Sequence, residues 1–559
     1  MLSLLTILFT LGAATEAPLP TLSVASIQME VSRDMEANLA RIGTGIEEAA
    51  HRGARVAVFP ECALSGFDKE TVAALDWARV DAARKQVAAW ADVHDLYVIY
   101  GCATPSGQDK PFNSAIILNP DGAEIFQYHK MVPEGWFTPG DRLALFQIDG
   151  VPATLVICHD ERYPELTRIP VLGGARILFY ISYEINNLDA AHRKIENYRG
   201  QLIGRAAENQ IWVVQSNGIT PEAERNGSAS LGYSRIVAPS GNVLEEAPEL
   251  QPALLVRTLD PNEASRGNAL RSLQIGPLAA WWKEGLGILE SSAHGASIQA
   301  VAPPKNKATL ALLQGVPVKW DLEANFKTFL DGLTDAVAAD LYLTPECWLD
   351  GYAAPDKNST PERLREIAQD PDTSPYLQRV AEEVKARGLY ICFGFTSLVD
   401  GKIYNSMGLW DDRGNRIGLY HKTHLQTHDL QYAAGESLPV FPTPWGPLGI
   451  MICADRRWPE TARTLRLKGA KLILNPSYGM HHEKNEMWMR TRSWENQAFI
   501  AFCHPNVGFV ANPKGDITGK RDEEPGVLLT TVDLSEARDD NHLQDRRPDL
   551  YGILGATPP

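Results

Sequence analysis

An internal repeat is the feature that most constrains how this chain can fold. The stretch TLVICHDERYPELTR, residues 154–168, returns as LGIMICADRRWPETAR, residues 448–463. In each copy an apolar run ends in a cysteine, and an acid, an arginine, an aromatic residue, Pro and Glu follow. An apolar run followed by Pro in the first turn of a helix is typical of a buried strand that leads into a helix. We therefore expect Cys158 and Cys453 at the ends of buried strands.

The repeat extends over nearly all of the 559 residues. LSVASIQM corresponds to ATLALLQG, FPECALSGF to TPECWLDGY, FNSAIILNPDG to YNSMGLWDDRG, and YHK recurs unchanged. Equivalent residues stay between 285 and 295 positions apart, a register that chance would not keep. Three pairs illustrate this spacing: Glu61 and Glu346, Lys130 and Lys422, Cys158 and Cys453.

Strands alternate with amphipathic helices and with hairpins in each copy, which predicts an α/β fold around mixed sheets. A chain of this length exceeds what one hydrophobic core usually organises. We therefore expect two tandem domains, over residues 20–274 and 308–559. A linker over residues 275–307, rich in Pro, Ala and Gly, would join them.

The N-terminus begins with an apolar run over residues 2–11 that is followed by small residues, although no Lys or Arg precedes Arg33. This pattern predicts a signal peptide over residues 1–17 and export to the periplasm or the cell exterior. The alternative is a plain N-terminal extension on a cytoplasmic protein. The run is too short to span a membrane, which takes about 20 apolar residues, and we expect no membrane span elsewhere.

The overall charge and the cysteine count exclude several classes of protein. A net charge of −16 and a pI near 5.4 argue against nucleic acid and anionic membrane surfaces as partners. The seven cysteines are an odd number, and most recur at matched positions of the two copies. Matched positions in separate domains are poor disulfide partners, so we expect unpaired thiols.

Three polar residue types recur at the ends of apolar strands, where an unpaired charge would be costly. A carboxylate beside a thiol can act as a general base, and an ammonium group can stabilise the thiolate and a developing oxyanion. The recurrence of all three types in the same order predicts covalent catalysis at a cysteine. The six residues are Glu61, Lys130 and Cys158 in the first half and Glu346, Lys422 and Cys453 in the second.

These motifs resemble the carbon–nitrogen hydrolase (nitrilase) superfamily. The resemblance rests on FPECALSGF, YHKMVPEGWFTPG and LVICHDERYPE in the first half, and on TPECWLDGY, YHKTHL and IMICADRRWPE in the second. It implies an αββα sandwich for each half and catalysis without a metal or an organic cofactor. It also implies that the halves pack together as a pseudo-dimer, and further oligomerisation is left open.

The resemblance implies a role for each residue type. Cysteine attacks the carbonyl or nitrile carbon, and glutamate takes the thiol proton and passes it to the leaving amine. Lysine stabilises the oxyanion together with the backbone N–H that follows the cysteine, in His159 and Ala454. Water then cleaves the thioester. Many family members add a second glutamate after the lysine, a place that Glu134 can fill, whereas the nearest acid in the second half is the shorter Asp429.

The first half departs from the family pattern at two points. Where the second half keeps Asn475 and Pro476 after the next strand, the first has Ser182 and Tyr183. Pro170 lies in the helix after Cys158, where it is expected to end or kink the helix. Neither departure removes a member of the triad. The Asp-x-Arg spacing in 160–162 and 455–457 is expected to form an ion pair that holds the turn, with direct contact to the substrate as the alternative.

The residues after the cysteine favour hydrolysis of a small amide or N-carbamoyl compound, because nitrilases proper usually have Trp and Glu there. Nitrile hydrolysis is the alternative substrate class. One half could instead be a non-catalytic scaffold or regulatory domain, and acyl transfer to an amine is a further alternative. His481, His482 and Glu483 are spaced like metal ligands, but the resemblance implies no metal site.

Overall fold

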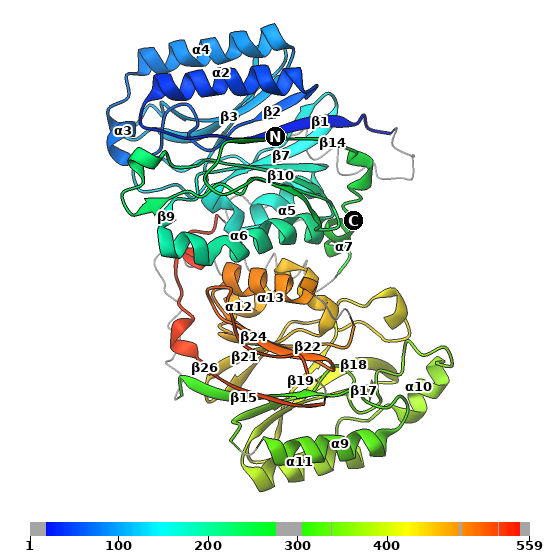
Figure 1. Ribbon diagram of the computed structural model, residues 1–559. Coiled ribbons are helices and arrows are strands. Elements are labelled where there is room, and N and C mark those ends of the chain that lie inside the picture. The colour runs from blue at the N-terminus through cyan, green and yellow to red at the C-terminus, as the bar shows by residue number, and fades with distance from the viewer. Residues whose placement is uncertain (1–17, 276–304, 337, 480–482, 524, 548–559) are drawn as a thin grey trace. The chain divides into compact units, whose positions relative to one another are not determined.

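The computed structural model describes residues 18–275, 305–336, 338–479, 483–523 and 525–547, which form two compact units (Figure 1). The first unit ends at Arg271 and the second begins at Ser272. The predicted signal peptide, residues 1–17, and residues 276–304 of the predicted linker lie outside the described residues. The boundaries assigned to them therefore stay predictions.

The first unit contains two mixed sheets of six strands each. Parallel strands form the centre of both sheets, and antiparallel strands form the edges. One sheet has the order β14(Ala253–Leu259), β1(Leu22–Gln28), β2(Val56–Val58), β3(Tyr97–Thr104), β4(Phe112–Leu118), β5(Glu124–His129). The other has the order β13(Val243–Glu246), β12(Arg235–Val237), β10(Trp212–Asn217), β8(Ile177–Ser182), β7(Val151–Ile157), β6(Phe146–Ile148).

The two sheets of the first unit face each other through their inner surfaces. The hydroxyl of Ser216 on β10 donates to the carbonyls of Ile27 and Val58 on the other sheet. Helices cover the outer faces: α2(Met35–His51) and α4(Trp77–His94) on one side, and α5(Pro164–Leu172) and α6(Leu188–Asn209) on the other (Figure 1). This arrangement is the four-layer αββα sandwich that the sequence predicts.

The second unit repeats the same architecture with the same order of strands. One sheet has the order β19(Arg416–His421), β18(Lys402–Trp410), β17(Tyr390–Val399), β16(Leu341–Leu343), β15(Lys307–Gln314), β26(Gly526–Asp533). The other has the order β20(Val440–Thr443), β21(Gly446–Ile450), β22(Leu472–Pro476), β23(Phe499–His504), β24(Val507–Ala511), β25(Ile517–Arg521). The larger helices are α9(Leu322–Asp335), α11(Pro375–Arg387), α12(Pro459–Leu467) and α13(Glu483–Asn496).

Shorter elements complete both units. In the first they are α3(Lys69–Ala73), β9(Asn186–Asn187), β11(Ser228–Ala229), α7(Gly267–Ser272) and the 3-10 turns η1(Cys158–Arg162), η2(Glu222–Glu224) and η3(Pro261–Glu263). In the second they are α10(Pro361–Ile367), α14(Asn541–Gln544) and the turns η4(Thr427–Asp429), η5(Cys453–Arg457) and η6(Leu534–Glu536).

Local chemistry explains where the main helices begin. The side chains of Asp34, Asp76, Asp321 and Ser374 accept hydrogen bonds from the first-turn N–H groups of α2, α4, α9 and α11. Such N-caps contribute about 1 kcal/mol each. The central strands are apolar almost throughout because both of their faces are buried, one under helices and one under the second sheet.

Within the described part of the chain, no helix is long and apolar enough to cross a membrane. All seven cysteines lie in described segments and are free of disulfide bonds, so the prediction of unpaired thiols is confirmed.

Candidate active site

Strand ends bring the predicted triad of the first unit to one region. Glu61 follows β2 and Lys130 follows β5, both strands of the first sheet. Cys158 follows β7 of the second sheet and begins the turn η1. Glu61 and Lys130 are fully buried, whereas Cys158 is partly exposed. The site therefore takes its glutamate and its lysine from one sheet and its thiol from the other.

The second unit places its residues in the same way. Glu346 follows β16, Lys422 follows β19, and Cys453 follows β21 and begins the turn η5. Glu346 and Lys422 are fully buried and Cys453 is 7% exposed. Each of the six predicted residues thus lies at the strand end that the repeat assigns to it.

Glycines allow the close packing behind these strand ends. The N–H of Gly435 donates to the carbonyl of Lys422, and a Cβ at Gly435 would collide with the carbonyl of His421. A Cβ at Gly394 on β17 would collide with the carbonyl of Pro345, next to Glu346. Gly140 and Gly101 hold the matching places in the first unit. The backbone on either side of the buried ion pair is therefore tightly fixed.

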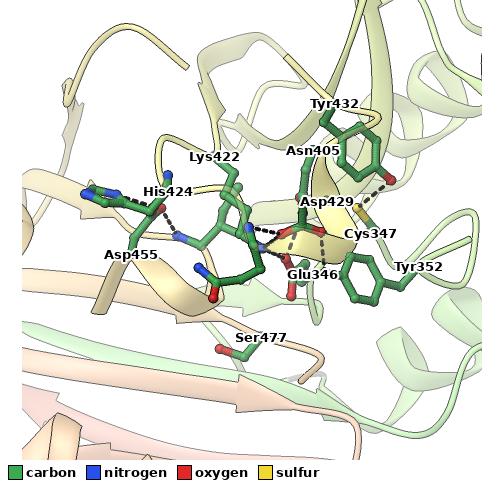
Figure 2. Close-up of polar contacts among 12 residues, drawn as sticks. Glu346, Cys347, Tyr352, Asn405, Lys422, His424, Asp429, Tyr432, Asp455 and Ser477 are labelled. Carbon is green, nitrogen blue, oxygen red and sulfur yellow. Dashed lines mark hydrogen bonds and ion pairs between the residues drawn. The ribbon is translucent and has the colours of Figure 1, made fainter. Parts of the chain in front are cut away.

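Lys422 lies between two buried carboxylates in the second site, as Figure 2 shows. Its Nζ is 2.7 Å from Glu346 Oε1 and 2.6 Å from Asp429 Oδ2. Asn405 Nδ2 also donates to Glu346 Oε1 at 2.7 Å, and the Tyr352 hydroxyl donates to Asp429 Oδ1 at 2.5 Å. The short turn η4 places Asp429 beside the lysine, so the shorter acid contacts Lys422 as Glu134 contacts Lys130.

The first site has the same core of contacts. Lys130 Nζ is 2.7 Å from Glu61 Oε1 and 2.8 Å from Glu134 Oε1. Asn113 Nδ2 donates to Glu61 Oε1 at 2.7 Å. In addition, the backbone N–H of Tyr183 donates to Glu61 Oε2 at 2.9 Å. Both oxygens of this glutamate are therefore hydrogen-bonded.

Burial and mutual attraction set the protonation of the first site. Burial raises the pKa of Glu61, although the ammonium group of Lys130 acts against this. Burial also opposes the charge on Lys130, but Glu134 and Glu61 outweigh it and raise the pKa of the lysine. Burial raises the pKa of the Cys158 thiol, and the charge of Glu61 adds to this while Lys130 lowers it. The thiol therefore responds electrostatically to both groups.

The second site shows the same electrostatic coupling. Burial opposes the charge on Lys422, but Glu346, Cys453 and Asp429 together raise its pKa. Burial also opposes the charge on Asp429, but Lys422 lowers the pKa of that carboxyl. The lysine is thus held in its charged form between its two acids.

Both cysteines adopt a backbone conformation that is uncommon for residues other than glycine. The φ angles of Cys158 and Cys453 are 44° and 46°. Such left-handed positions cost roughly 1–3 kcal/mol and concentrate at functional sites. The following residues, His159 and Ala454, lie in the first turn of η1 and η5, and their role as oxyanion donors stays a prediction.

A buried aspartate two residues after each cysteine holds the turn, but not through the expected arginine. Asp160 accepts from the Tyr128 hydroxyl at 2.8 Å and from the backbone N–H groups of residues 131 and 132. Asp455 accepts from the Tyr420 hydroxyl at 2.7 Å and from His424, through its N–H and its ring. The contacts of these two carboxylates come from hydroxyl, backbone and histidine donors, and Arg457 donates to Gln426, so the predicted Asp–Arg ion pairs are not what holds the turns here.

Pro170 lies inside helix α5 and does not end it, so of the two expected effects the end is wrong and the kink stays a prediction. Helix α5 continues to Leu172 and is nine residues long, as is α12 in the second unit. Only two helical residues follow the proline.

His481, His482 and the side chain of Glu483 lie outside the described residues. In the segments that the structure does describe, no three His, Cys, Asp or Glu side chains are grouped so that they could hold a metal ion.

Sequence reasoning missed several residues that hold the sites together. Asn113 and Asn405 lie in the repeated Asn-Ser dipeptide of β4 and β18, and Tyr128 and Tyr420 precede the repeated His-Lys. Their identity in both copies was a signal that could have found them. Tyr352 has no such signal, because the first copy has Phe67 at the corresponding place.

The chain matches the carbon–nitrogen hydrolase family twice, over residues 23–267 and 309–541. These matches cover most of the chain, so it belongs to that family, as its motifs predict. Over 265 aligned residues the chain is 32% identical to a Pseudomonas protegens protein named "hydrolase in pqqF 5′ region". This alignment covers 44% of this chain and 91% of that protein.

Two further comparisons each match less than half of the chain. It is 29% identical over 274 residues to deaminated glutathione amidase of Bos taurus, with 42% of this chain and 81% of that protein covered. A crystal structure of an amidase from Nesterenkonia sp. is 23% identical, with a TM-score of 0.39, and covers 45% of this chain and 95% of that one.

Proposed function

We propose that the chain hydrolyses the C–N bond of a small amide or N-carbamoyl compound through two Glu-Lys-Cys sites. The observation that carries this proposal is the buried lysine that each unit holds between two carboxylates, electrostatically coupled to a cysteine at a strained strand end. Membership of the carbon–nitrogen hydrolase family and the amidases among the relatives support it.

The reaction begins when the cysteine sulfur attacks the carbonyl carbon and its proton passes to the triad glutamate. The lysine ammonium stabilises the oxyanion, and the glutamate then delivers the proton to the leaving nitrogen. The acyl group stays on sulfur as a thioester. Water attacks this thioester with the same glutamate as base, which releases the acid and restores the thiol. A general base contributes about 10² to 10⁴ in rate and one oxyanion donor about 10² to 10³.

Ammonia release from simple amides, N-carbamoyl amino acids and nitriles tests this proposal. The wild-type chain should hydrolyse at least one amide or carbamoyl compound faster than any nitrile. Replacement of both nucleophiles, Cys158→Ala and Cys453→Ala, should abolish turnover while circular dichroism stays that of the wild type. Full activity of the double variant would rule out the thioester route, and a preference for nitriles would favour the alternative substrate class.

A further inference from the structure

A further carboxylate lies at the active-site edge of the first unit and has no part in the proposed chemistry. Glu184 follows β8, the strand whose Ile181 lies beside Ile157, the residue before Cys158. Parallel strands that lie side by side end at the same edge of a sheet, where α/β proteins bind their ligands. The residue before Glu184, Tyr183, donates its backbone N–H to the triad glutamate. Glu184 therefore belongs to the surroundings of the nucleophile.

The hydrogen bonds of Glu184 come from neutral side chains. Its Oε1 accepts from the Tyr180 hydroxyl at 2.9 Å and from Gln215 Nε2 at 3.1 Å. Its Oε2 accepts a longer contact of 3.4 Å from Asn217 Nδ2. Each carboxylate oxygen has two lone pairs and can accept two hydrogen bonds. Oε2 therefore retains the capacity to accept a donor from a bound molecule.

The positive groups near Glu184 donate to other acceptors. Burial lowers the pKa of Lys194 and the charge of Glu184 opposes this, but Lys194 Nζ donates to Asn186 Oδ1 at 2.6 Å. Burial raises the pKa of Glu184 to about 7 and the charge of Arg235 opposes this, but Arg235 Nε donates to Glu246. Within the described segments, Glu184 therefore forms no salt bridge of its own.

A small cavity lies beside this carboxylate. Its volume is about 10 Å³, which is room for about one water-sized group. Polar and apolar side chains both line it, among them Glu184, Asn217, Arg235, Ala191, Ile195 and Leu231. An ammonium group has this size, and the methylene groups attached to it would contact the apolar side chains.

The second unit lacks the carboxylate. The pairing of β21 with β22 repeats the pairing of β7 with β8, so Gly479 takes the place of Glu184. The next pair of strands also keeps its register, which puts Phe502 at the place of Gln215. Neither of these side chains has a polar group. The two sites therefore share a triad but differ in the groups that surround the rest of a substrate.

We propose that the first site takes amides or carbamoyl compounds that carry a primary ammonium group, which Glu184 binds through Oε2 while the carbonyl carbon lies at Cys158. This proposal rests on the proposed Glu-Lys-Cys chemistry and makes Glu184 a specificity-determining residue. An ammonium group supplies a positive charge and three N–H donors to the carboxylate. A hydrogen bond to a charged group corresponds to roughly 10- to 100-fold in an equilibrium, which sets the size of the expected effect.

Pairs of isosteric amides test the proposal through kcat/KM for ammonia release. The probes are 3-aminopropanamide, 4-aminobutanamide and 5-aminopentanamide, each compared with the amide in which a methyl group replaces the ammonium group. Cys453→Ala leaves the first site alone, and its kcat/KM should be at least 10-fold higher for the ammonium member of one or more pairs. Cys158→Ala leaves the second site alone and should show no such preference.

The failures of the two proposals are distinguishable. If the first site shows no preference in any pair, or hydrolyses none of these amides while the second site is active, the substrate assignment is overturned and the proposed function stands. Full activity of the double variant, Cys158→Ala with Cys453→Ala, would refute the proposed function itself.

Glu184→Gln tests the residue that is held responsible. In the Cys453→Ala protein it should lower the preference for the ammonium member about 10-fold or more and change kcat/KM for the methyl member less. The preference is the readout because burial and nearby charges, that of Glu184 included, raise the pKa of the Cys158 thiol, which affects both members of a pair alike.

Glu196→Gln is the matched control for this variant. Glu196 lies on α6, is 61% exposed and pairs with Arg199, so its replacement should leave the preference unchanged. An unchanged preference with Glu184→Gln, in a protein that still hydrolyses the methyl member, would overturn the proposal. If Glu184→Gln does not fold, the comparison of the amide pairs on the first site decides alone.

Discussion

Replacement of Lys422 by methionine tests how far the second site depends on one buried cation. Its ammonium group lies 2.7 Å from Glu346 and 2.6 Å from Asp429, and all three side chains are fully buried. At an effective dielectric constant of about 20, each contact corresponds to roughly 6 kcal/mol of gross Coulomb attraction, much of it offset by desolvation. Removal of one partner from a buried pair costs about 3–5 kcal/mol. We expect this loss in the free energy of unfolding at pH 7.5.

The loss should depend on pH in a defined direction. Lys422 lowers the pKa of Asp429 in the folded protein, so its stabilising effect is present above the unfolded pKa of about 4 and is lost as the pH falls through the folded pKa. In the methionine variant the lowering is absent and burial raises the carboxyl pKa, so the carboxylates take up protons at a higher pH. The destabilisation should therefore be larger at pH 7.5 than at pH 5.

Urea unfolding followed by tryptophan fluorescence measures both values. Lys327→Met is the matched control, because Lys327 lies in the same unit, is 73% exposed and pairs with Asp331 on the helix surface. Exposed pairs of this kind contribute at most about 0.5 kcal/mol. A loss below about 1 kcal/mol for Lys422→Met, or equal losses at both pH values, would refute the account of the buried cation.

Three further perturbations follow from the same geometry. Tyr352→Phe removes the hydroxyl that donates to the accessory acid and should lower the free energy of unfolding by about 1.5–3 kcal/mol; a loss below about 0.5 kcal/mol in urea unfolding would contradict this. Burial raises the pKa of Glu184 to about 7, and its charge raises the pKa of Cys158. Glu184→Gln should therefore speed iodoacetamide labelling of the Cys158 peptide at pH 7.5 several-fold relative to labelling of the Cys453 peptide. The ratio of the two labelled peptides is measured by mass spectrometry, and an unchanged ratio would contradict this prediction. Gly394→Ala places a Cβ against the strand end that carries Glu346 and should lower kcat about 100-fold; near wild-type turnover in the ammonia assay would show that the backbone there can give way.

The sequence predicted the fold because the repeat doubled every local signal. A single apolar run before Cys158 is ambiguous, but its return before Cys453 in the same order of motifs fixed the strand, the turn and the helix after it. The mixed α/β sheets followed from the alternation of strands and helices, and the αββα layers from the family resemblance. The grouping of Glu, Lys and Cys at strand ends followed from their recurrence alone.

The contacts within the sites were less predictable, because they depend on side-chain directions in three dimensions. Asp429 reaches Lys422 only because η4 turns the chain back toward β19, which no spacing rule indicates. Asp455 was expected to pair with Arg457, but it accepts hydrogen bonds from the hydroxyl of Tyr420 and the backbone N–H of His424. The contact between Tyr183 and Glu61 spans 122 residues of sequence and involves a backbone group that is the same in every residue except proline.

Trapping the acyl-enzyme tests the central claim most directly. The protein is mixed with its preferred amide, quenched in acid within milliseconds to seconds, digested and analysed by peptide mass spectrometry. We predict an acyl adduct on the Cys453 peptide that is removed by neutral hydroxylamine, as a thioester is, and that is absent from the Cys453→Ala variant. Continued turnover with no adduct on the peptide of Cys453 or of Cys158 would contradict covalent catalysis at these cysteines.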